Sequence, residues 1–499
     1  MAKIVIIGGG VSGLSAGIYA RICGHEAVIC EMGGCVGGNL TGWQRGEYHI
    51  DNCIHWLTGT NPATDIYKMW EDLGALGDVE VMQAESLYTY KRGDKRVSLF
   101  CDLERTRTHM LEISPCDEYE IDKLFEAVRA VQGHCGIAGD AHNEKHGAIK
   151  DVFSMLCLYR YYRMSTGELA KKFYSPLLRD FLTSFLGEDF GSIALVVVFA
   201  HFSGNNGGIP RGSSRGMAER MVERFKLLGG RLLLKSEVVR INTKDGKSVS
   251  VSLKNGEVEE TDYVIVTIDP ATVFGKLIDA PMPQGLASKY NDCNMQRFSA
   301  LHCAFSCDLD SLPFESDIIF EIPEDKQISL GSKNLVLREF SHEPSFAPSG
   351  KNIIQSVIFC PEEICKEFIK LKADRAAYTQ RKKEMAETIQ GIIEKEFPEL
   401  RGKLDVIDVW TPATYKRFIG SEIGSFMSFA LPHKCLPIRT SNKIRGIDNV
   451  FLATQWQQIP GGLPIAAEGG RLAVKSIEEL EKKRTSTSKH KVSGKVSHA

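Results

Sequence analysis

Near its start the chain reads Lys3-Ile4-Val5-Ile6-Ile7-Gly8-Gly9-Gly10-Val11-Ser12-Gly13. The apolar run at 3–7 is rich in β-branched residues, which is typical of a strand buried on both faces. After the glycines, an apolar stripe at helical spacing stops before Gly24, a residue suited to the end of a helix. A strand, a glycine turn and a helix in this order predict the first βαβ unit of a doubly wound α/β fold.

The glycines of this turn fit the GxGxxG pattern, and each has a physical role. Gly8 permits the tight turn, Gly10 lets the backbone approach a pyrophosphate, and Gly13 allows the helix to pack closely on the strand. Val11 and Ser12 begin the helix, where unpaired N–H groups and the positive end of the helix dipole favour phosphates. The pattern predicts a Rossmann-like dinucleotide-binding domain.

A second apolar run, at 27–30, ends at Glu31, 18 residues after Gly13. A carboxylate at this distance can accept hydrogen bonds from the hydroxyl groups of a ribose. Its negative charge also disfavours a phosphate at the ribose 2′ position. We therefore expect Glu31 to bind the ribose of the dinucleotide.

A second glycine-rich turn, Met32-Gly33-Gly34-Cys35-Val36-Gly37-Gly38-Asn39, follows the acid. Glycines leave room where a backbone lies against a cofactor. This arrangement resembles the FAD-containing amine oxidase and phytoene desaturase superfamily, in which a glycine pair follows the ribose-binding acid. The resemblance implies FAD as the cofactor, bound in part by Gly37, Gly38 and Asn39, although Asn39 stands where that family usually has an arginine.

Residues 46–56 read Gly-Glu-Tyr-His-Ile-Asp-Asn-Cys-Ile-His-Trp. This segment resembles one of the phytoene desaturase, carotenoid isomerase and retinol saturase branch, with Asn52-Cys53 in place of the usual x-Gly. The resemblance implies that His55 and Trp56 lie beside the flavin ring. A buried, hydrogen-bonded core histidine is the alternative interpretation of His55.

The segment near the end of the chain carries a second resemblance to the same branch. A strand at 449–453 leads into Thr454-Gln455-Trp456-Gln457-Gln458-Ile459-Pro460-Gly461-Gly462-Leu463-Pro464 and then into a helix. In that branch the loop closes over the isoalloxazine and the ribityl chain, and the helix N-terminus points at the flavin. The resemblance implies cofactor contacts from Gln455, Gly462, Leu463 and Pro464, with Gln455 and Trp456 close to the ring.

The middle of the chain returns to a nucleotide-fold pattern. A turn at 210–216 leads into a helix, and alternating apolar residues separated by Asp-Gly and Asn-Gly turns predict a β-meander from about 232 to 261. The resemblance implies that Val239 contacts the adenine through its backbone.

We expect a discontinuous FAD-binding domain and an inserted α+β substrate domain. The FAD-binding domain would comprise residues 1–80, 205–290 and 431–481, and the substrate domain 81–204 and 291–430. Residues 482–499 carry six basic side chains and no acids, with almost no apolar content. This composition predicts a basic, disordered tail.

Composition excludes several classes of protein. The 61 basic and 63 acidic side chains give a net charge of −2, which argues against a dedicated nucleic-acid binder. The longest apolar stretch, at 193–202, falls short of the roughly 20 residues that span a bilayer. The 14 cysteines include no CxxC pair, and no metal-ligand cluster or export signal is evident, so we expect a cytoplasmic protein without a metal site. Weak contact of the tail with a membrane surface is an alternative.

The resemblance implies an FAD-dependent oxidoreductase that acts on carbon–carbon bonds of a lipophilic, polyene- or prenyl-lipid-like substrate. Desaturation, saturation and isomerisation all remain open, with hydride exchanged at flavin N5 and NAD(P)H as one candidate electron donor. No pair of acid–base residues stands out in the sequence, and a flavin carries such chemistry itself. One alternative is an FAD enzyme that oxidises amines or another small apolar substrate. Another is a flavin-binding protein without turnover.

Overall fold

The computed structural model describes residues 1–132, 157–292 and 294–493. Its first part is built on a six-stranded sheet in the order β10-β2-β1-β14-β21-β20. The strands pair in parallel except for β20, which runs antiparallel to β21. Their bounds are β1 Lys3–Ile7, β2 Glu26–Cys30, β10 Arg231–Leu233, β14 Tyr263–Val266, β20 Lys443–Ile444 and β21 Ile447–Leu452. The doubly wound α/β fold is confirmed.

Alternating side chains of β1 enter two separate cores. Ile4 and Ile6 pack in a cluster with α1 (Val11–Ile22), α9 (Ser213–Leu227) and α16 (Leu463–Ser493). Val5 and Ile7 pack on the opposite face, toward the β-meander. A strand covered on both faces requires this continuous apolar run.

The β-meander is shorter than the sequence predicts. It consists of β11 (Val238–Lys244), β12 (Lys247–Leu253) and β13 (Val258–Glu260). Residues 231–233, which we placed at its start, form β10 and pair in parallel with β2 at the edge of the main sheet. The reason is that Leu232 and Leu233 find their partners in Ile29 and Cys30, far away in the sequence.

The second part of the molecule is an α+β unit around a seven-stranded sheet in the order β19-β15-β18-β17-β16-β7-β8. Two distant chain segments share this sheet, since β16 pairs in parallel with β7. The strand bounds are β7 Ser86–Arg92, β8 Lys95–Phe100, β15 Phe298–Cys307, β16 Ile318–Glu321, β17 Asn334–Glu339, β18 Asn352–Pro361 and β19 Leu404–Trp410.

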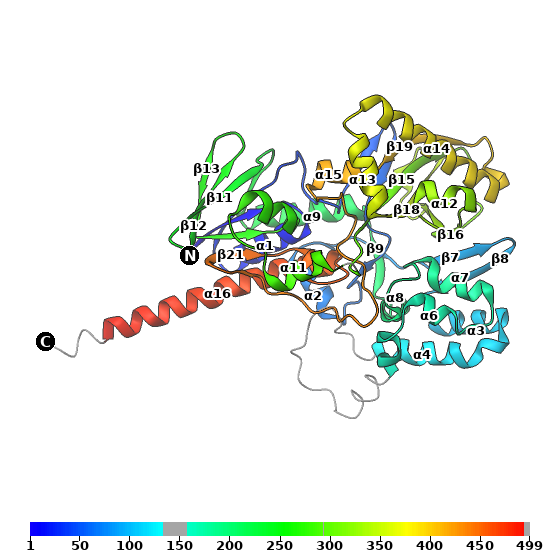
Figure 1. The fold of residues 1–499 in the computed structure, drawn as a ribbon, viewed down its shortest axis with the longest axis horizontal. Coiled ribbons are helices and arrows are strands. Elements are labelled where there is room, and N and C mark those ends of the chain that lie inside the picture. The colour runs from blue at the N-terminus through cyan, green and yellow to red at the C-terminus, as the bar shows by residue number, and fades with distance from the viewer. Residues whose placement is uncertain (133–156, 293, 494–499) are drawn as a thin grey trace.

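Helices cover this sheet in two groups (Figure 1). The first group packs near β7 and β8 and comprises α3 Leu103–Ile113, α4 Glu118–Gln132, α6 Thr166–Ala170, α7 Pro176–Ser184 and α8 Ser192–Ser203. The second comprises α12 Glu324–Leu330, α13 Glu362–Leu371, α14 Arg375–Glu396 and α15 Pro412–Ile419.

Short ribbons connect the two parts. A hairpin of β3 (Gly42–Arg45) and β4 (Tyr48–Asp51) follows the second glycine turn. β9 (Gly207–Pro210) pairs with β5 (Leu57–Thr58) and β6 (Val81–Met82). The segment after His55 is thereby joined to the residues that follow α8.

The tail differs from its prediction. Residues 482–493 continue α16, which extends beyond the folded body, instead of forming a disordered segment (Figure 1). A helix that is anchored at its N-terminal end can propagate through a polar sequence, since each further residue adds one backbone hydrogen bond. Residues 494–499 lie outside the described part.

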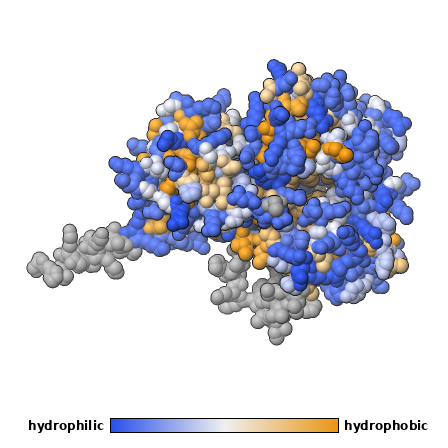
Figure 2. Space-filling view, in the orientation of Figure 1, coloured by the Kyte–Doolittle hydropathy of each residue, from blue (hydrophilic) through white to orange (hydrophobic). Residues whose placement is uncertain are grey.

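Hydrophilic side chains cover most of the face seen in Figure 2, and hydrophobic areas are small and scattered. Among the described residues, we find no helix with the length and apolar content needed to cross a membrane.

Candidate active site

A cavity of about 2380 Å³ extends between the two parts of the molecule. It begins at the N-terminal glycine turn and Glu31, passes Trp56 and Gln455, and reaches apolar side chains of α8. The sequence-predicted cofactor and flavin-proximal residues that line it are Gly8, Gly10, Val11, Ser12, Glu31, Gly37, Gly38, Asn39, His55, Trp56, Val239, Gln455, Trp456, Gly462, Leu463 and Pro464. Two distant ends of the chain therefore face one space.

The glycines of the N-terminal turn have two different roles. Gly8 and Gly13 are required by the fold, whereas Gly10 faces the cavity. Gly8 has φ +102°, and a Cβ on Gly13 would lie 1.9 Å from the Gly8 carbonyl oxygen, so both positions require glycine for the fold itself. A Cβ on Gly10 would meet no protein atom closer than 3.9 Å. The protein alone gives no reason for a glycine at position 10. A pyrophosphate lying against this backbone would give one, so the site fits a dinucleotide.

Glu31 joins the two glycine turns. One carboxylate oxygen accepts a hydrogen bond from Gly9 N at 2.7 Å, and the other accepts from Gly33 N at 2.6 Å. The residue is 9% exposed, and burial raises its pKa although both hydrogen bonds oppose that shift. Each oxygen keeps a further lone pair that a ribose hydroxyl can use.

The second glycine turn lies directly against the first. Gly37 N donates to Gly9 O at 2.8 Å, and Gly37 and Gly38 have φ of +113° and +63°. A Cβ on Gly37 would lie 2.1 Å from Leu40 O. These glycines are therefore fixed by the fold as well as by the space that a cofactor needs.

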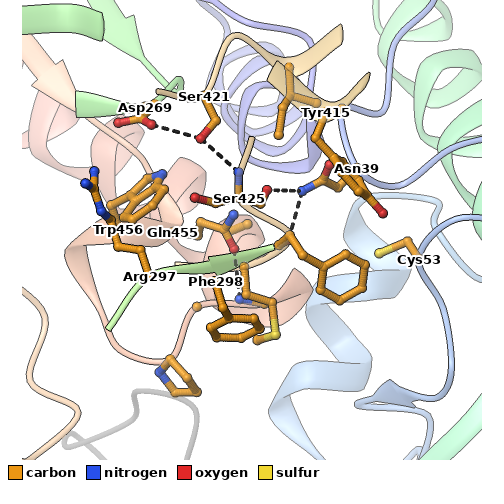
Figure 3. A pocket seen from close by; sticks show the side chains of 18 of the residues that line it. Asn39, Cys53, Asp269, Arg297, Phe298, Tyr415, Ser421, Ser425, Gln455 and Trp456 are labelled. Atoms are coloured by element: carbon orange, nitrogen blue, oxygen red, sulfur yellow. Dashed lines mark hydrogen bonds between the residues drawn. The ribbon is translucent and has the colours of Figure 1, made fainter. Parts of the chain in front are cut away.

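Asn39 ties this turn to the other part of the molecule. Its side-chain Nδ2 donates to the backbone oxygens of Phe426 at 2.9 Å and Ser425 at 3.5 Å (Figure 3). Its own carbonyl accepts from Asn52 Nδ2 at 3.0 Å. The amide that replaces the arginine of the resembling family thus adds no positive charge, and serves as a neutral link between the second glycine turn and segment 425–426.

The C-terminal loop is closed by its own side chains. Gln455 Oε1 accepts from Gly462 N at 3.1 Å, and Thr454 Oγ1 accepts from Trp456 N at 3.0 Å. Gly461 and Gly462 have φ of +85° and +102°, and α16 begins immediately afterward at Leu463. The carbonyl of Gln455 is occupied within the loop, which leaves its amide nitrogen for a ligand.

Trp456 is a structural neighbour of the cavity. Its indole ring stacks on Tyr290 at 5.6 Å and meets Phe429 edge-on at 5.1 Å between centroids. Tyr290 donates to Asp269 at 2.8 Å, and its burial beside Asp269 raises the pKa of the phenol. These aromatic contacts and the Asp269 carboxylate fix the position of the 454–464 loop through Trp456.

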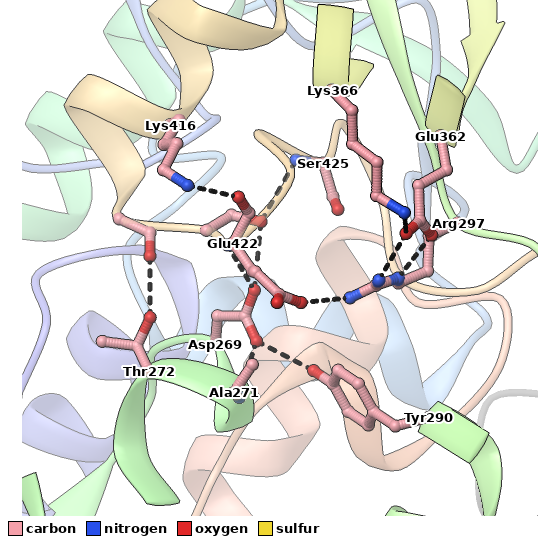
Figure 4. A network of polar contacts seen from close by, with 12 residues as sticks. Asp269, Ala271, Thr272, Tyr290, Arg297, Glu362, Lys366, Lys416, Glu422 and Ser425 are labelled. Carbon is pink, nitrogen blue, oxygen red and sulfur yellow. Dashed lines mark hydrogen bonds and ion pairs between the residues drawn. The ribbon is translucent and has the colours of Figure 1, made fainter. Parts of the chain in front are cut away.

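A polar wall continues from Asp269 (Figure 4). The other Asp269 oxygen accepts from Ser421 Oγ at 3.1 Å and from Glu422 N at 3.0 Å. Arg297 pairs with Glu362 at 2.8 Å and with Glu422 at 2.5 Å. The wall therefore joins Arg297, the residue before β15, with α13 and the 421–425 segment to the loop that follows β14.

His55 forms its side-chain contact with the second part of the molecule. Its Nδ1 lies 3.1 Å from Asp317 Oδ2, and Asp317 also pairs with Arg338 at 3.5 Å. Arg338 donates to Ile54 O at 2.6 Å. Burial is the main cause that lowers the pKa of His55, followed by the charge of Arg338. His55 is a neutral, hydrogen-bonded residue of the cavity wall.

The neighbouring Asp51 has a structural role that the motif does not reveal. Its two oxygens accept from Ser214 N at 2.9 Å and Ser214 Oγ at 2.8 Å, at the first turn of α9. Cys53 N also donates to it at 3.3 Å. Asp51 binds the start of a helix, where a carboxylate satisfies unpaired N–H groups.

Several residues of the site carried no signal in the sequence. Asp269, Tyr290 and Arg297 are isolated polar residues, and only the fold brings them together. In the described part of the chain, no group of three or more His, Cys, Asp and Glu side chains is placed to hold a metal ion.

A family model for flavin containing amine oxidoreductases matches residues 11–477 of the chain. Among curated proteins, the chain is similar to prolycopene isomerase 1 of an Oncidium hybrid cultivar, with 28% identity over 290 residues. That match covers 54% of this chain and 47% of the isomerase, so the chain spans about half the length of this relative.

The chain is also similar to the 4,4'-diapophytoene desaturase of Staphylococcus aureus (strain Newman), with 22% identity, 96% of this chain and 99% of the desaturase covered. Among solved structures, an oxidoreductase from Methanosarcina mazei matches with a TM-score of 0.66 and 15% identity. That match covers 96% of this chain and all of the other. At this identity the likeness concerns the fold.

Proposed function

Since this chain belongs to the flavin containing amine oxidoreductase family, we propose that it is an FAD-dependent oxidoreductase acting on carbon–carbon bonds of a lipophilic substrate. The substrate class is a polyene or prenyl lipid, and the reaction is a desaturation, a saturation or an isomerisation. The isomerase and desaturase to which the chain is similar support this choice over amine oxidation.

One observation carries the proposal: the open space in front of the Gly10 backbone belongs to the same cavity as the apolar surface of α8. Phe298, Phe359 and Val197 line its substrate end. An elongated hydrocarbon chain gains free energy from such walls in proportion to the apolar area that it buries. The cavity thus suits a dinucleotide at one end and a lipophilic chain at the other.

When bound, FAD supplies two-electron hydride chemistry that the side chains lack. Glu31 and the turns at Gly10 and Gly38 would hold its nucleotide portion, and Gln455 with the start of α16 would face its ring. The helix dipole stabilises negative charge near the N-terminus of α16. The aromatic and aliphatic walls orient the substrate and exclude water.

The test is spectroscopic. We expect the purified protein to show a flavin absorption band, and chemically reduced protein to be reoxidised under anaerobic conditions by an added polyene or by its desaturated product. Reduction of the flavin by an amine, with release of peroxide, would favour the amine oxidase alternative. A protein that neither retains nor takes up FAD would overturn the proposal.

NAD(P)H is our proposed electron donor for reactions that need a reduced flavin. The test is anaerobic mixing with NADH or NADPH, with dithionite as the positive control. Bleaching by dithionite alone would reject the nicotinamide donor and leave the flavin assignment intact.

We also propose weak contact with anionic membranes through the end of α16. Lys482, Lys483 and Arg484 lie where this helix leaves the folded body, and a basic residue near a surface contributes about 1 kcal/mol. Cosedimentation with vesicles containing phosphatidylserine should decrease when the chain is truncated after Glu481, and equal cosedimentation would reject this contact.

A further inference from the structure

The apolar end of the cavity contains one polar side chain from α8. The α8 residues that line the cavity share one helical face, and they are Ile193, Ala194, Val197, Val198 and His201. Four of them are aliphatic, so His201 is a polar interruption of an apolar wall. Its ring is mostly buried, and burial lowers the pKa of His201 to about 4. The imidazole is therefore neutral near pH 7.

The neighbouring Asn206 fixes the tautomer of this ring. The Asn206 Oδ1 atom accepts from Gly59 N and Asn61 N, each at 3.0 Å. Both donors are backbone N–H groups, so the oxygen must face them and the amide nitrogen must face the other way. That nitrogen lies 2.9 Å from His201 Nδ1. Since the amide nitrogen can only donate, Nδ1 accepts and the proton of the neutral ring is on Nε2.

The side-chain hydrogen bond to Asn206 involves Nδ1, and no hydrogen bond joins Nε2–H to any residue that the structure describes. A polar group that becomes covered without a partner weakens binding, whereas one that is paired strengthens it. A pure hydrocarbon lying against α8 would cover this donor without satisfying it. A ligand with an acceptor oxygen at that place would satisfy it.

His201 is linked through Asn206 to the part of the cavity predicted to hold the flavin ring. Asn206 directly precedes Gly207, and a Cβ on Gly207 would lie 2.9 Å from the ring of Trp56. The short strand β9 thus connects the histidine to a residue beside the predicted flavin position.

We infer that His201 determines substrate specificity by donating its Nε2–H to a carbonyl or hydroxyl oxygen on an otherwise apolar chain. The preferred substrate is then an oxygenated prenyl or polyene lipid rather than a hydrocarbon. This inference rests on the proposed function and names the substrate class of the same cavity. His201 is a binding residue, and the oxygen that it contacts need not react.

The test compares two probes that differ only in the acceptor. Farnesylacetone carries a ketone oxygen, and the isosteric hydrocarbon has a methylene group in its place. Binding to flavin-loaded protein is read from the perturbation of the flavin spectrum and from quenching of tryptophan fluorescence. We expect the ketone to bind roughly three- to tenfold more tightly, as one neutral hydrogen bond allows.

Two variants of His201 separate the donor from the ring. His201→Gln keeps an N–H donor at a similar distance from the backbone, and the ketone preference should persist. His201→Phe keeps the planar ring and loses the donor, so both probes should bind alike. His109→Phe, outside the cavity lining, is the control. An undiminished ketone preference in His201→Phe would overturn the inference.

Asn206→Asp tests the tautomer without changing His201. A carboxylate still accepts from Gly59 N and Asn61 N, but it also accepts from His201 Nδ1–H, which leaves Nε2 of the neutral ring without its proton. Because a carboxylate favours the doubly protonated ring, both probes are compared at pH 9, where the imidazole is neutral. The ketone preference should then disappear, and its survival would contradict the inference. If the parent binds both probes equally, the inference fails while the proposed function stands. If the parent binds neither, the lipophilic substrate itself is rejected.

Discussion

At Gly10, a substitution can test cofactor binding without disturbing the fold. Because a Cβ there would meet no protein atom closer than 3.9 Å, Gly10→Val should fold with a melting temperature close to that of the parent apoprotein. The side chain would occupy the approach of the pyrophosphate, so we expect FAD to be lost on desalting. Absorbance of the protein and its thermal unfolding measure the two effects.

Gly391→Val is the matched control, since a Cβ at this helical position also meets nothing within 4 Å and Gly391 is exposed and outside the cavity lining. It should retain the flavin. Retention of the parent's flavin content in Gly10→Val would show that the cradle does not hold the pyrophosphate.

Glu31 provides a second prediction at the level of a single side chain. In Glu31→Gln, one of the N–H groups of Gly9 and Gly33 would face an amide nitrogen that cannot accept. The ribose would also lose a charged acceptor, so FAD should bind about 10- to 100-fold more weakly, the value of a hydrogen bond to a charged group. Titration of apoprotein with FAD measures this, with the partly buried Glu26→Gln, outside the cavity lining, as control. An unchanged dissociation constant would argue against the ribose contact.

At the level of elements, Asp51 links β4 to α9. Its side chain is 1% exposed and accepts three hydrogen bonds from Ser214 and Cys53. Asp51→Ala would leave these donors buried and unpaired, and should lower the free energy of unfolding by about 2–4 kcal/mol. Urea unfolding of the apoprotein measures the loss. Asp94→Ala, in an exposed turn, should change stability little; a similar loss in both variants would refute the helix-capping role.

The sequence predicted those elements whose partners lie close by or follow a known pattern. The order strand, glycine turn, helix, strand and acid at 3–31 is local, and β1, α1 and β2 form as expected. We predicted β10 as part of the meander because the sequence around Leu232 does not show that this residue pairs with the distant Ile29. We predicted residues 482–493 as disordered because their composition does not show that they continue a helix whose earlier turns, from Leu463, pack in the folded body.

The site was predictable to the same extent. Both glycine turns and the 454–464 loop contribute residues to the cavity lining, and their contacts with FAD stay a prediction. The roles of Asp51, Asn206 and Arg297 were not predictable, because each depends on a partner from a distant segment. Asn206 is an example: one of its amide atoms binds Gly59 and Asn61, and the other binds His201.

For the whole molecule, buried neutral histidines predict a loss of stability in mild acid. Burial is the main cause that lowers the pKa of His55, His201, His302 and His342 below the ordinary 6.5. In the unfolded chain these groups titrate near 6.5. Between about pH 4 and 6.5 the unfolded state therefore binds protons that the folded state does not. Their contribution to stability is complete above pH 6.5 and decreases as the pH falls through this window.

We expect the melting temperature of the apoprotein to be nearly constant from pH 7 to 8 and to fall toward pH 5. Comparison of the parent with His201→Gln isolates the contribution of this one histidine. Buried carboxylates such as Glu31, whose raised pKa increases stability as the pH falls, are present in both proteins, so their effect cancels. With a folded pKa of about 4, His201 should account for about 2 kcal/mol of the loss at pH 5. The difference in unfolding free energy between parent and variant should therefore shift by that amount between pH 7.5 and 5. Parallel pH profiles would mean that His201 takes up its proton in the folded protein, and a charged ring would then also donate from Nδ1, against the orientation that Asn206 imposes.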